Sequence, residues 1–164
     1  MRFTLDQFIA ALPKLVSDIS GVVVATYNNL DSHQGGGEFI ANGRKVSILC
    51  GGAAYANVGG MPDDEAQTTK TAGAKQVSDD LAKTSSNSLV ILYAGKSRFD
   101  EIVLLSHRLA ERGSKVALVS CGCDKNVFDG FEFNENISLV VPTNADCNGG
   151  RGDLSRIVAQ LLNW

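Results

Sequence analysis

Four cysteines offer the first candidate chemistry in this chain, because thiolates bind zinc or iron–sulfur clusters and can act as nucleophiles. One ends a predicted strand, two follow another strand, and the fourth lies in a late loop; they are Cys50, Cys121, Cys123 and Cys147. Parallel strands would bring all four to one edge of a sheet. The Cys-x-Cys pair lacks the usual metal-ligand spacing, however, and cysteine is often buried as a small apolar residue. A metal or thiol site is therefore an alternative beside simple packing of these side chains.

A second candidate is the tripeptide Gly95-Lys96-Ser97, which follows a predicted strand and precedes a predicted helix. It is similar to the end of a phosphate-binding P-loop, but the earlier glycine that such a loop requires falls on Val90, inside the strand. A simpler anion site survives this objection, formed by the Lys96 ammonium, the Ser97 hydroxyl and backbone N–H groups. The competing interpretation is that Ser97 caps the helix and Lys96 is solvated.

Two loops rich in glycine and amide side chains are the other candidates for a ligand site. Residues 51–61 contain paired glycines, although the G-x-G-x-x-G spacing of a dinucleotide fingerprint is absent. Residues 142–152 are unusually polar for a simple connection. We expect backbone N–H groups and Lys96 to hold an anion, and amide and carboxyl side chains to hold a base or sugar. The predicted ligand-binding residues are Gly51, Gly52, Asn57, Lys96, Ser97, Thr143, Asn144 and Asp146.

The remaining reactive residues form no recognisable catalytic motif. His33 and His107 lack the neighbouring groups of a triad, so the catalytic residues stay unknown, and whether the protein is an enzyme stays open. The run Asp63-Asp64-Glu65 could bind a hard cation, but acidic residues at a helix start are explained by the helix macrodipole. Arg151-Gly152-Asp153 spells an adhesion tripeptide, yet Asp153 is better explained as a helix cap.

The first helix carries two separate start signals. Thr4 and Gln7 have the spacing of a capping box, and Phe3 and Phe8 stand at the positions of a hydrophobic staple. We therefore expect the helix to begin near Leu5. Its apolar residues recur every three or four positions, which predicts one buried face.

Short β-branched segments predict strands in the rest of the first half. Residues 21–27 form one such strand. Residues 38–41 and 45–50 are joined by Asn42-Gly43, which is a strong signal for an antiparallel hairpin. Residues 63–83 predict a weakly amphipathic helix whose inner positions are mostly small.

The second half has the pattern of a βαβ unit. Residues 88–94 and 115–120 are apolar strands, and a helix between Ser97 and Gly113 joins them. Residues 137–141 indicate a last strand. Strands that are apolar on both faces imply a parallel sheet covered on both sides. The final helix starts at Asp153 and buries Leu154, Ile157, Val158, Leu161 and Leu162.

The predicted fold class is α/β, a Rossmann-like three-layer sandwich. Its sheet is mostly parallel, with about five or six strands and an antiparallel hairpin at one edge. In such sheets ligands bind beyond the carboxyl ends of the strands. The candidate loops named above all leave that edge.

Residues 88–124, with a strand, a short Gly95 turn, a helix, Gly113 and a second strand, resemble part of the von Willebrand factor A-like domains. The resemblance covers less than a quarter of the chain. That family binds a metal through D-x-S-x-S on its first central strand, and here the helix at Leu5 leaves no room for that strand. A later aspartate of the family is replaced by Ala94. The resemblance implies a metal-free protein-interaction module, which is our alternative function.

Length and composition limit the class of protein. The chain has 164 residues, of which 44% are hydrophobic and 20% charged, so we expect a single globular domain over residues 1–164. Fifteen basic residues against 18 acidic ones provide no broad cationic field for nucleic acid. No apolar run approaches the ~20 residues of a membrane span. Without a signal peptide we expect a cytoplasmic protein with reduced thiols.

The leading hypothesis is a small-molecule-binding α/β domain. Its ligand is expected to be nucleotide-like or phosphorylated and to lie at the carboxyl ends of the strands. The sequence identifies no cofactor. A homo-oligomer is a further hypothesis, because the small residues of the helix over residues 63–83 let two backbones approach closely.

Overall fold

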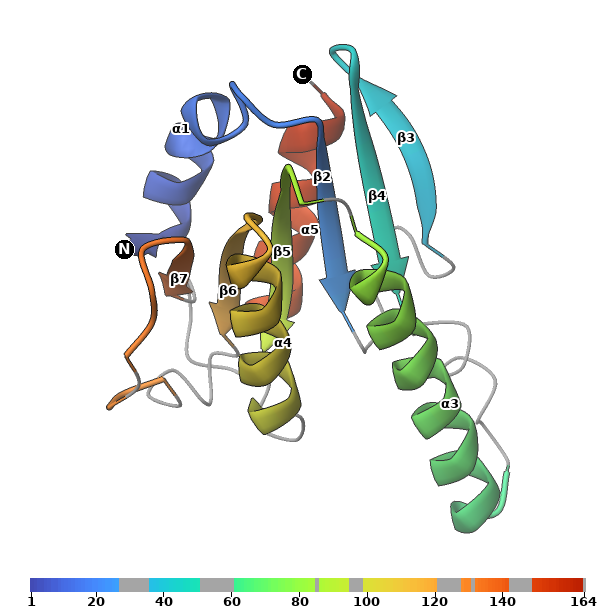
Figure 1. The fold of residues 1–164 in the computed structure, drawn as a ribbon. Coiled ribbons are helices and arrows are strands. Elements are labelled where there is room, and N and C mark those ends of the chain that lie inside the picture. The colour runs from blue at the N-terminus through green and yellow to red at the C-terminus, as the bar shows by residue number, and fades with distance from the viewer. Residues whose placement is uncertain are drawn as a thin grey trace.

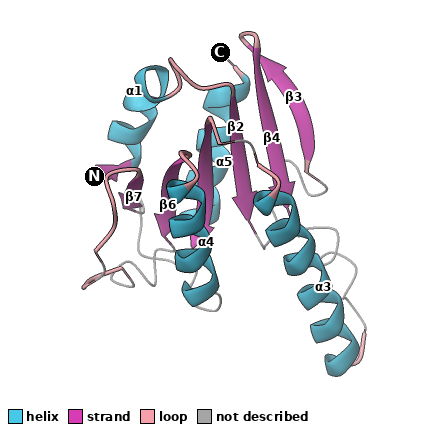
Figure 2. Ribbon diagram, viewed as in Figure 1, coloured by secondary structure: helices cyan, strands magenta, loops and turns pink. Residues whose placement is uncertain are grey.

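A central sheet with helices on both faces forms the fold (Figure 1, Figure 2). The computed structural model describes residues 1–26, 36–50, 61–84, 86–94, 99–120, 128–130, 132–141 and 149–163. The strands are β1 (Arg2–Thr4), β2 (Gly21–Thr26), β3 (Gly37–Ala41), β4 (Arg44–Cys50), β5 (Ser88–Ala94), β6 (Lys115–Ser120) and β7 (Ile137–Val141). The helices are α1 (Leu5–Leu15), α3 (Asp63–Ala82), α4 (Phe99–Glu111) and α5 (Gly149–Leu162). The predicted α/β sandwich is confirmed.

The strand order in the sheet is β1-β7-β6-β5-β2-β4-β3. Only β3 and β4 pair antiparallel, whereas the other neighbouring strands of this sheet are parallel. The sheet has seven strands, so the prediction of five or six was too low. The strand that sequence analysis missed is β1.

Strand β1 lies directly before α1 and pairs with β7 at the edge of the sheet. Its three residues are too few to show a period-two pattern, which is why the sequence did not reveal it. β1 is an edge strand and not the first central strand for which the sequence showed no room before the helix at Leu5. The middle of the sheet is occupied by β5, with β2 beside it.

The start of α1 confirms both predicted signals. Thr4 Oγ1 accepts from the backbone N–H of Gln7 over 3.2 Å, and Gln7 Oε1 accepts from that of Thr4 over 2.9 Å. The rings of Phe3 and Phe8 lie 5.8 Å apart between centroids, as a hydrophobic staple requires. Leu5 is therefore the first residue of the helix, as predicted.

The hairpin between β3 and β4 also follows the prediction. Asn42 and Gly43 adopt φ angles of 50° and 74°, the left-handed values of a type I′ turn. Ala41 pairs with Arg44 on the two sides of this turn. The turn type fixes the register of the two strands, so the hairpin lies at one edge of the sheet as expected.

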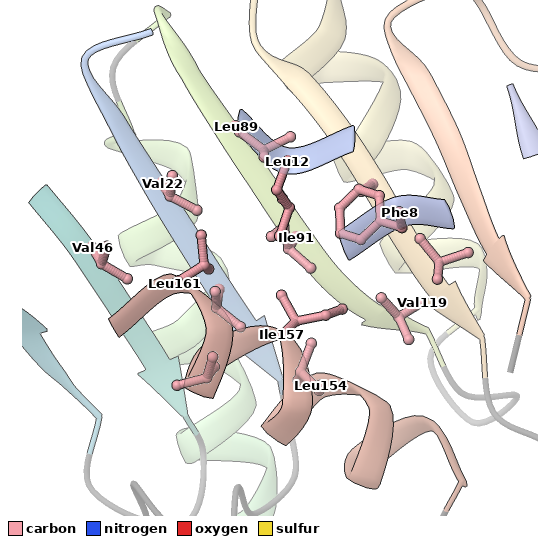
Figure 3. Close-up of a cluster of buried hydrophobic side chains, with 14 of the residues drawn as sticks. Phe8, Leu12, Val22, Val46, Leu89, Ile91, Val119, Leu154, Ile157 and Leu161 are labelled. Carbon is pink, nitrogen blue, oxygen red and sulfur yellow. The ribbon is translucent and has the colours of Figure 1, made fainter. Parts of the chain in front are cut away.

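One face of the sheet is covered by α1 and α5. Figure 3 shows Phe8 and Leu12 of α1 and Leu154, Ile157 and Leu161 of α5 packed on strand residues of that face. The other face is covered by α3 and α4, through residues such as Val77, Leu81, Ile102 and Leu109. Strands β2, β5 and β6 are buried on both faces, which explains their nearly continuous apolar sequences.

The final helix begins earlier than predicted. It starts at Gly149, so Asp153 lies inside α5 and is not its N-terminal cap. Glycine has a low helix propensity, and the glycines before Asp153 hid the first turn from pattern analysis. The apolar stripe of the helix was predicted well, since Leu154, Ile157, Val158 and Leu161 are buried and Leu162 is partly buried.

Helix α4 ends at Glu111, and the predicted end signal, Gly113, follows two residues later with a φ angle of +95°. The N–H of Gly113 donates to the Ala110 carbonyl over 3.0 Å, and that of Ser114 donates to the Leu109 carbonyl over 3.1 Å. These two bonds define a Schellman motif. The adjacent Arg112 side chain donates to the carbonyl oxygens of Ala82 and Thr84 at the end of α3, over 2.7 and 3.3 Å.

Helix α3 runs from Asp63 to Ala82, close to the predicted residues 63–83. Its 20 residues span about 30 Å, which is longer than the six-residue β2 and the seven-residue β4 that it contacts. Figure 1 shows its first half extending past the carboxyl ends of β2 and β4. Val77 and Leu81, in its second half, are buried against the sheet.

Replacement of Gly36 by alanine tests the close approach before β3. Gly36 has a φ angle of +73°, and a Cβ there would overlap the Ile48 carbonyl oxygen. We expect Gly36→Ala to lower the free energy of unfolding by more than about 2 kcal/mol, measured by urea denaturation. Gly43 is the control, because it has a similar φ of +74° and no atom within 4 Å of the added Cβ. Gly43→Ala should cost about 1 kcal/mol, and an equal loss in both variants would contradict the steric argument.

A second prediction concerns the two hydrogen bonds that Arg112 donates at the end of α3. Arg112→Ala removes both donors to the terminal carbonyls of α3, so the free energy of unfolding should fall by about 1 kcal/mol. Arg108→Ala is the matched control on the same helix, because Arg108 is also exposed. Thermal or urea unfolding measures both variants, and equal stability of the two would show that the bridge contributes nothing.

Candidate functional site

The chain leaves the two central strands β2 and β5 in opposite directions. After β2 it continues to β3 and β4 on one side of the sheet, and after β5 it continues through α4 to β6 on the other side. These two strands are neighbours, with Ala25 opposite Leu92. Such a topological switch point opens a crevice at the carboxyl ends of the strands, where ligands bind in open α/β sheets. The carboxyl ends of β2 and β5 are therefore the candidate site.

A row of chemically active side chains crosses this edge of the sheet. Cys50 is the last residue of β4 and lies opposite Thr26, the last residue of β2. In the neighbouring strand β5, Tyr93 follows Leu92, which pairs with Ala25 of β2. Side chains alternate along a strand, so these three residues share the face that α1 and α5 cover. Thr26 is 2% exposed and Tyr93 6% exposed, whereas Cys50 is half-buried.

Asp153 of α5 adds a carboxyl group to the same end of this layer. Helix α5 begins at the carboxyl edge of the sheet and runs back toward the other edge (Figure 1). Asp153 stands one turn before Ile157, a core residue, and is itself only 3% exposed. We call Cys50, Thr26, Tyr93 and Asp153 the switch-point cluster. Each of the four has an interaction in the structure, as a buried polar group requires.

Of these four residues, Cys50 alone was predicted from the sequence as part of a site. Thr26 and Tyr93 stand near the ends of long apolar strands, where a polar side chain is the usable signal. Asp153 lies four residues before Ile157, on the helical repeat of the apolar stripe. A carboxyl group on that repeat predicts a buried acid rather than a cap. The strand order that brings the residues to one place was not visible in the sequence.

The opposite face of this edge has a different character. Ser120 ends β6 and is buried, and the alternation along the strand directs it toward the layer of α3 and α4. The first turn of α4 carries Asp100 and Glu101. Ser78 Oγ of α3 lies 3.0 Å from Glu101 Oε1, so this hydroxyl joins the two helices. An anion near the start of α4 would therefore need a cation to offset these two carboxylates.

All eight ligand-binding residues predicted from the sequence lie outside the described residues. These are Gly51, Gly52, Asn57, Lys96, Ser97, Thr143, Asn144 and Asp146. The segments that carry them leave the carboxyl ends of β4, β5 and β7. Four strand spacings, about 19 Å, separate β4 from β7 in the sheet. The predicted site residues therefore stay predictions; the segment with Lys96 and Ser97 directly follows β5, one of the two switch-point strands.

The structure describes Cys50 alone of the four cysteines in the predicted metal or thiol site. Cys50 ends β4, and Cys121 directly follows the end of β6, three strand spacings or about 14 Å away. Cys121, Cys123 and Cys147 lie outside the described residues. Within the described ranges, no three His, Cys, Asp or Glu side chains are grouped closely enough to hold a metal ion. The cysteine site stays a prediction.

His107 has a packing role in the structure. It is half-buried and stacks on Phe133, with ring centroids 5.8 Å apart and an interplanar angle of 14°. Phe133 in turn meets Phe128, which packs against Phe99 of α4. His33 lies outside the described residues. Asp63, Asp64 and Glu65 form the exposed first turn of α3, where carboxylates favour the helix dipole.

Comparison with known proteins assigns no family to the chain. No protein-family model matches it, and no curated protein matches it. The resemblance to von Willebrand factor A-like domains therefore stays a prediction. None of the described helices combines the length and the apolar character needed to cross a membrane.

Near-isosteric substitutions test whether the hydroxyls of the switch-point cluster support the fold. Thr26→Val and Tyr93→Phe keep the shape of two buried side chains and remove one buried hydroxyl each. We expect each to lower the free energy of unfolding by about 1 kcal/mol, measured by urea denaturation. Unchanged stability in both variants would show that neither hydroxyl takes part in holding the fold.

Proposed function

We propose that the protein binds a small phosphorylated or nucleotide-like molecule at the carboxyl ends of β2 and β5. The observation that carries this proposal is the reversal of chain direction between these two strands. A reversal of this kind leaves room between the outgoing connections for a ligand, and helix N-termini begin at the same edge.

Two kinds of group serve the two parts of such a ligand. Lys96, which follows β5 by two residues, provides the positive charge for the phosphate and offsets Asp100 and Glu101 of α4. The hydroxyl and carboxyl groups of the switch-point cluster are buried beneath this place on the side of α5, where they give the proposed base or sugar a polar floor. The proposal concerns binding. We also propose a cytoplasmic location, because a nucleotide-like ligand and reduced thiols both fit that compartment.

A thermal-shift series with Lys96 variants tests the proposal. Nucleotides, sugar phosphates and inorganic phosphate are screened with and without divalent metal ions, because a ligand of the folded state raises the melting temperature. We expect one phosphorylated class to stabilise the protein by about 3 kcal/mol at a hundredfold excess over its Kd, and Lys96→Ala to remove most of this gain.

Lys83→Ala is the matched control for this series. Lys83 is an exposed lysine at the C-terminal end of α3, near the start of β5 and so at the opposite edge of the sheet. The control removes the same charge and should leave the shift intact. Equal loss in both variants would indicate a general charge effect, and the absence of any shift with the unmodified protein would reject the proposal.

The protein-interaction module is the alternative that this test would favour if no ligand binds. A docking surface of that kind needs a contiguous apolar patch. Among the described residues, the large exposed hydrophobic side chains of the sheet and helices are Ile40 and Leu104. Ile40 belongs to the edge strand β3, whereas Leu104 belongs to α4, which packs on β5 and β6. The two side chains are thus separated, which makes small-molecule binding the better supported function.

A further inference from the structure

Strand β3 ends the sheet on one side, so one row of its backbone groups has no neighbouring strand among the described residues. Residues that flank a two-residue turn form a hydrogen-bonded pair, and such pairs alternate along an antiparallel ladder. Starting from Ala41 and Arg44, the bonded residues of β3 are therefore Ala41, Phe39 and Gly37. Glu38 and Ile40 direct their N–H and C=O groups toward the outer edge instead.

The side chains of the same two residues are exposed. Ile40 is 75% exposed, which is unusual for a large apolar side chain on a strand. Glu38 forms an ion pair with Lys45 of β4, with 2.8 Å between Glu38 Oε1 and Lys45 Nζ. Both of these charged side chains are more than half exposed. Ile40 lies opposite Lys45, and Glu38 lies opposite Ser47. The outer edge of β3 thus presents two donors, two acceptors, one apolar side chain and one balanced pair of charges.

We infer that two copies of this chain associate by antiparallel pairing of their β3 strands, around a twofold axis at Phe39. In this register Glu38 of one copy stands opposite Ile40 of the other, and the reverse. All four outward-facing groups on each strand then pair, which gives four hydrogen bonds across the axis. An axis at Ile40 would use only the groups of Ile40, because the residue opposite Glu38 would be Asn42, which belongs to the turn.

Charge complementarity favours a second copy over an unrelated strand. Across the joined sheet, a row on one face would read Lys45, Ile40 and then Glu38 of the second copy. Each glutamate therefore lies between the Lys45 of its own hairpin and the Lys45 of the other copy. The aliphatic parts of the lysines flank both Ile40 side chains, which removes them from water. A partner strand without an acidic residue opposite Ile40 would lack this additional attraction to Lys45.

The association is expected to be concentration-dependent, because only five residues of each β3 strand take part. It does not depend on the proposed ligand, since β3 lies outside the switch point and is separated from β2 by β4. It also uses a different surface from the helix over residues 63–83 that sequence analysis suggested for a homo-oligomer. The other edge strand, β1, has only three residues.

Sedimentation velocity over a concentration series of the full chain tests the inference, together with amide hydrogen exchange. We expect a monomer–dimer equilibrium in which rising concentration slows exchange at the Glu38 and Ile40 amides. The Phe39 amide, already bonded to β4, should show little concentration dependence. Ile40→Pro removes an outward N–H without removing a bond to β4, so the hairpin is retained. It should weaken dimerisation by about tenfold or more.

Two further variants separate edge pairing from other causes. Ile40→Glu places a carboxylate directly opposite Glu38 of the second copy without restricting the backbone, so this like-charge pair should also favour the monomer even if Ile40→Pro fails to fold. Leu104→Gln is the control that removes an exposed apolar side chain elsewhere, and it should dimerise like the unmodified chain. A protein that stays monomeric at its highest soluble concentration overturns the inference. A dimer that both Ile40 variants leave unchanged also overturns it.

Discussion

The strands β2, β5 and β6 carry apolar side chains on both faces, and the rest of the fold follows from the need to cover both. Val22 and Val24 face α1 and α5, while Val23 and Ala25 of the same strand face α3 and α4. Two helical layers are therefore required, and each helix must be reached by a crossover connection. The path from β1 to β2 crosses the sheet in one direction over one face. The paths from β4 to β5 and from β5 to β6 cross in the opposite direction over the other face, so all these crossovers have the same hand.

This arrangement collects chemistry at one edge of the sheet. In the parallel sheet all crossover connections leave from the carboxyl ends, so polar loops and helix starts meet there while the strand centres stay apolar. The composition of the core changes accordingly along the strands. Val24 and Ile91 in the middle of β2 and β5 are followed on the same face by Thr26 and Tyr93 near the ends. Along α5 the change is the same, because the polar Asp153 near the start of the helix is followed by the apolar Ile157 and Leu161.

Local signals allowed much of the fold to be predicted from the sequence. The capping box and staple of α1, the type I′ turn after Ala41 and the glycine at the end of α4 each involve residues within a few positions of one another. Their energies depend on local geometry, so the sequence alone specifies them. β1 and the first turn of α5 escaped prediction because neither has such a signal. β1 becomes a strand only by pairing with β7, more than 130 residues later in the chain.

For the candidate site, too, the sequence determined one part and the tertiary structure the other. The sequence by itself determined the fold class, the type of side chain in each loop and the edge of the sheet at which the loops leave. Only the tertiary structure decided the strand order, and with it the switch point between β2 and β5 and the placing of Thr26, Tyr93 and Asp153 at the carboxyl end of one layer. Strand order depends on long-range pairing and on the packing of whole faces, and no short stretch of residues encodes either one.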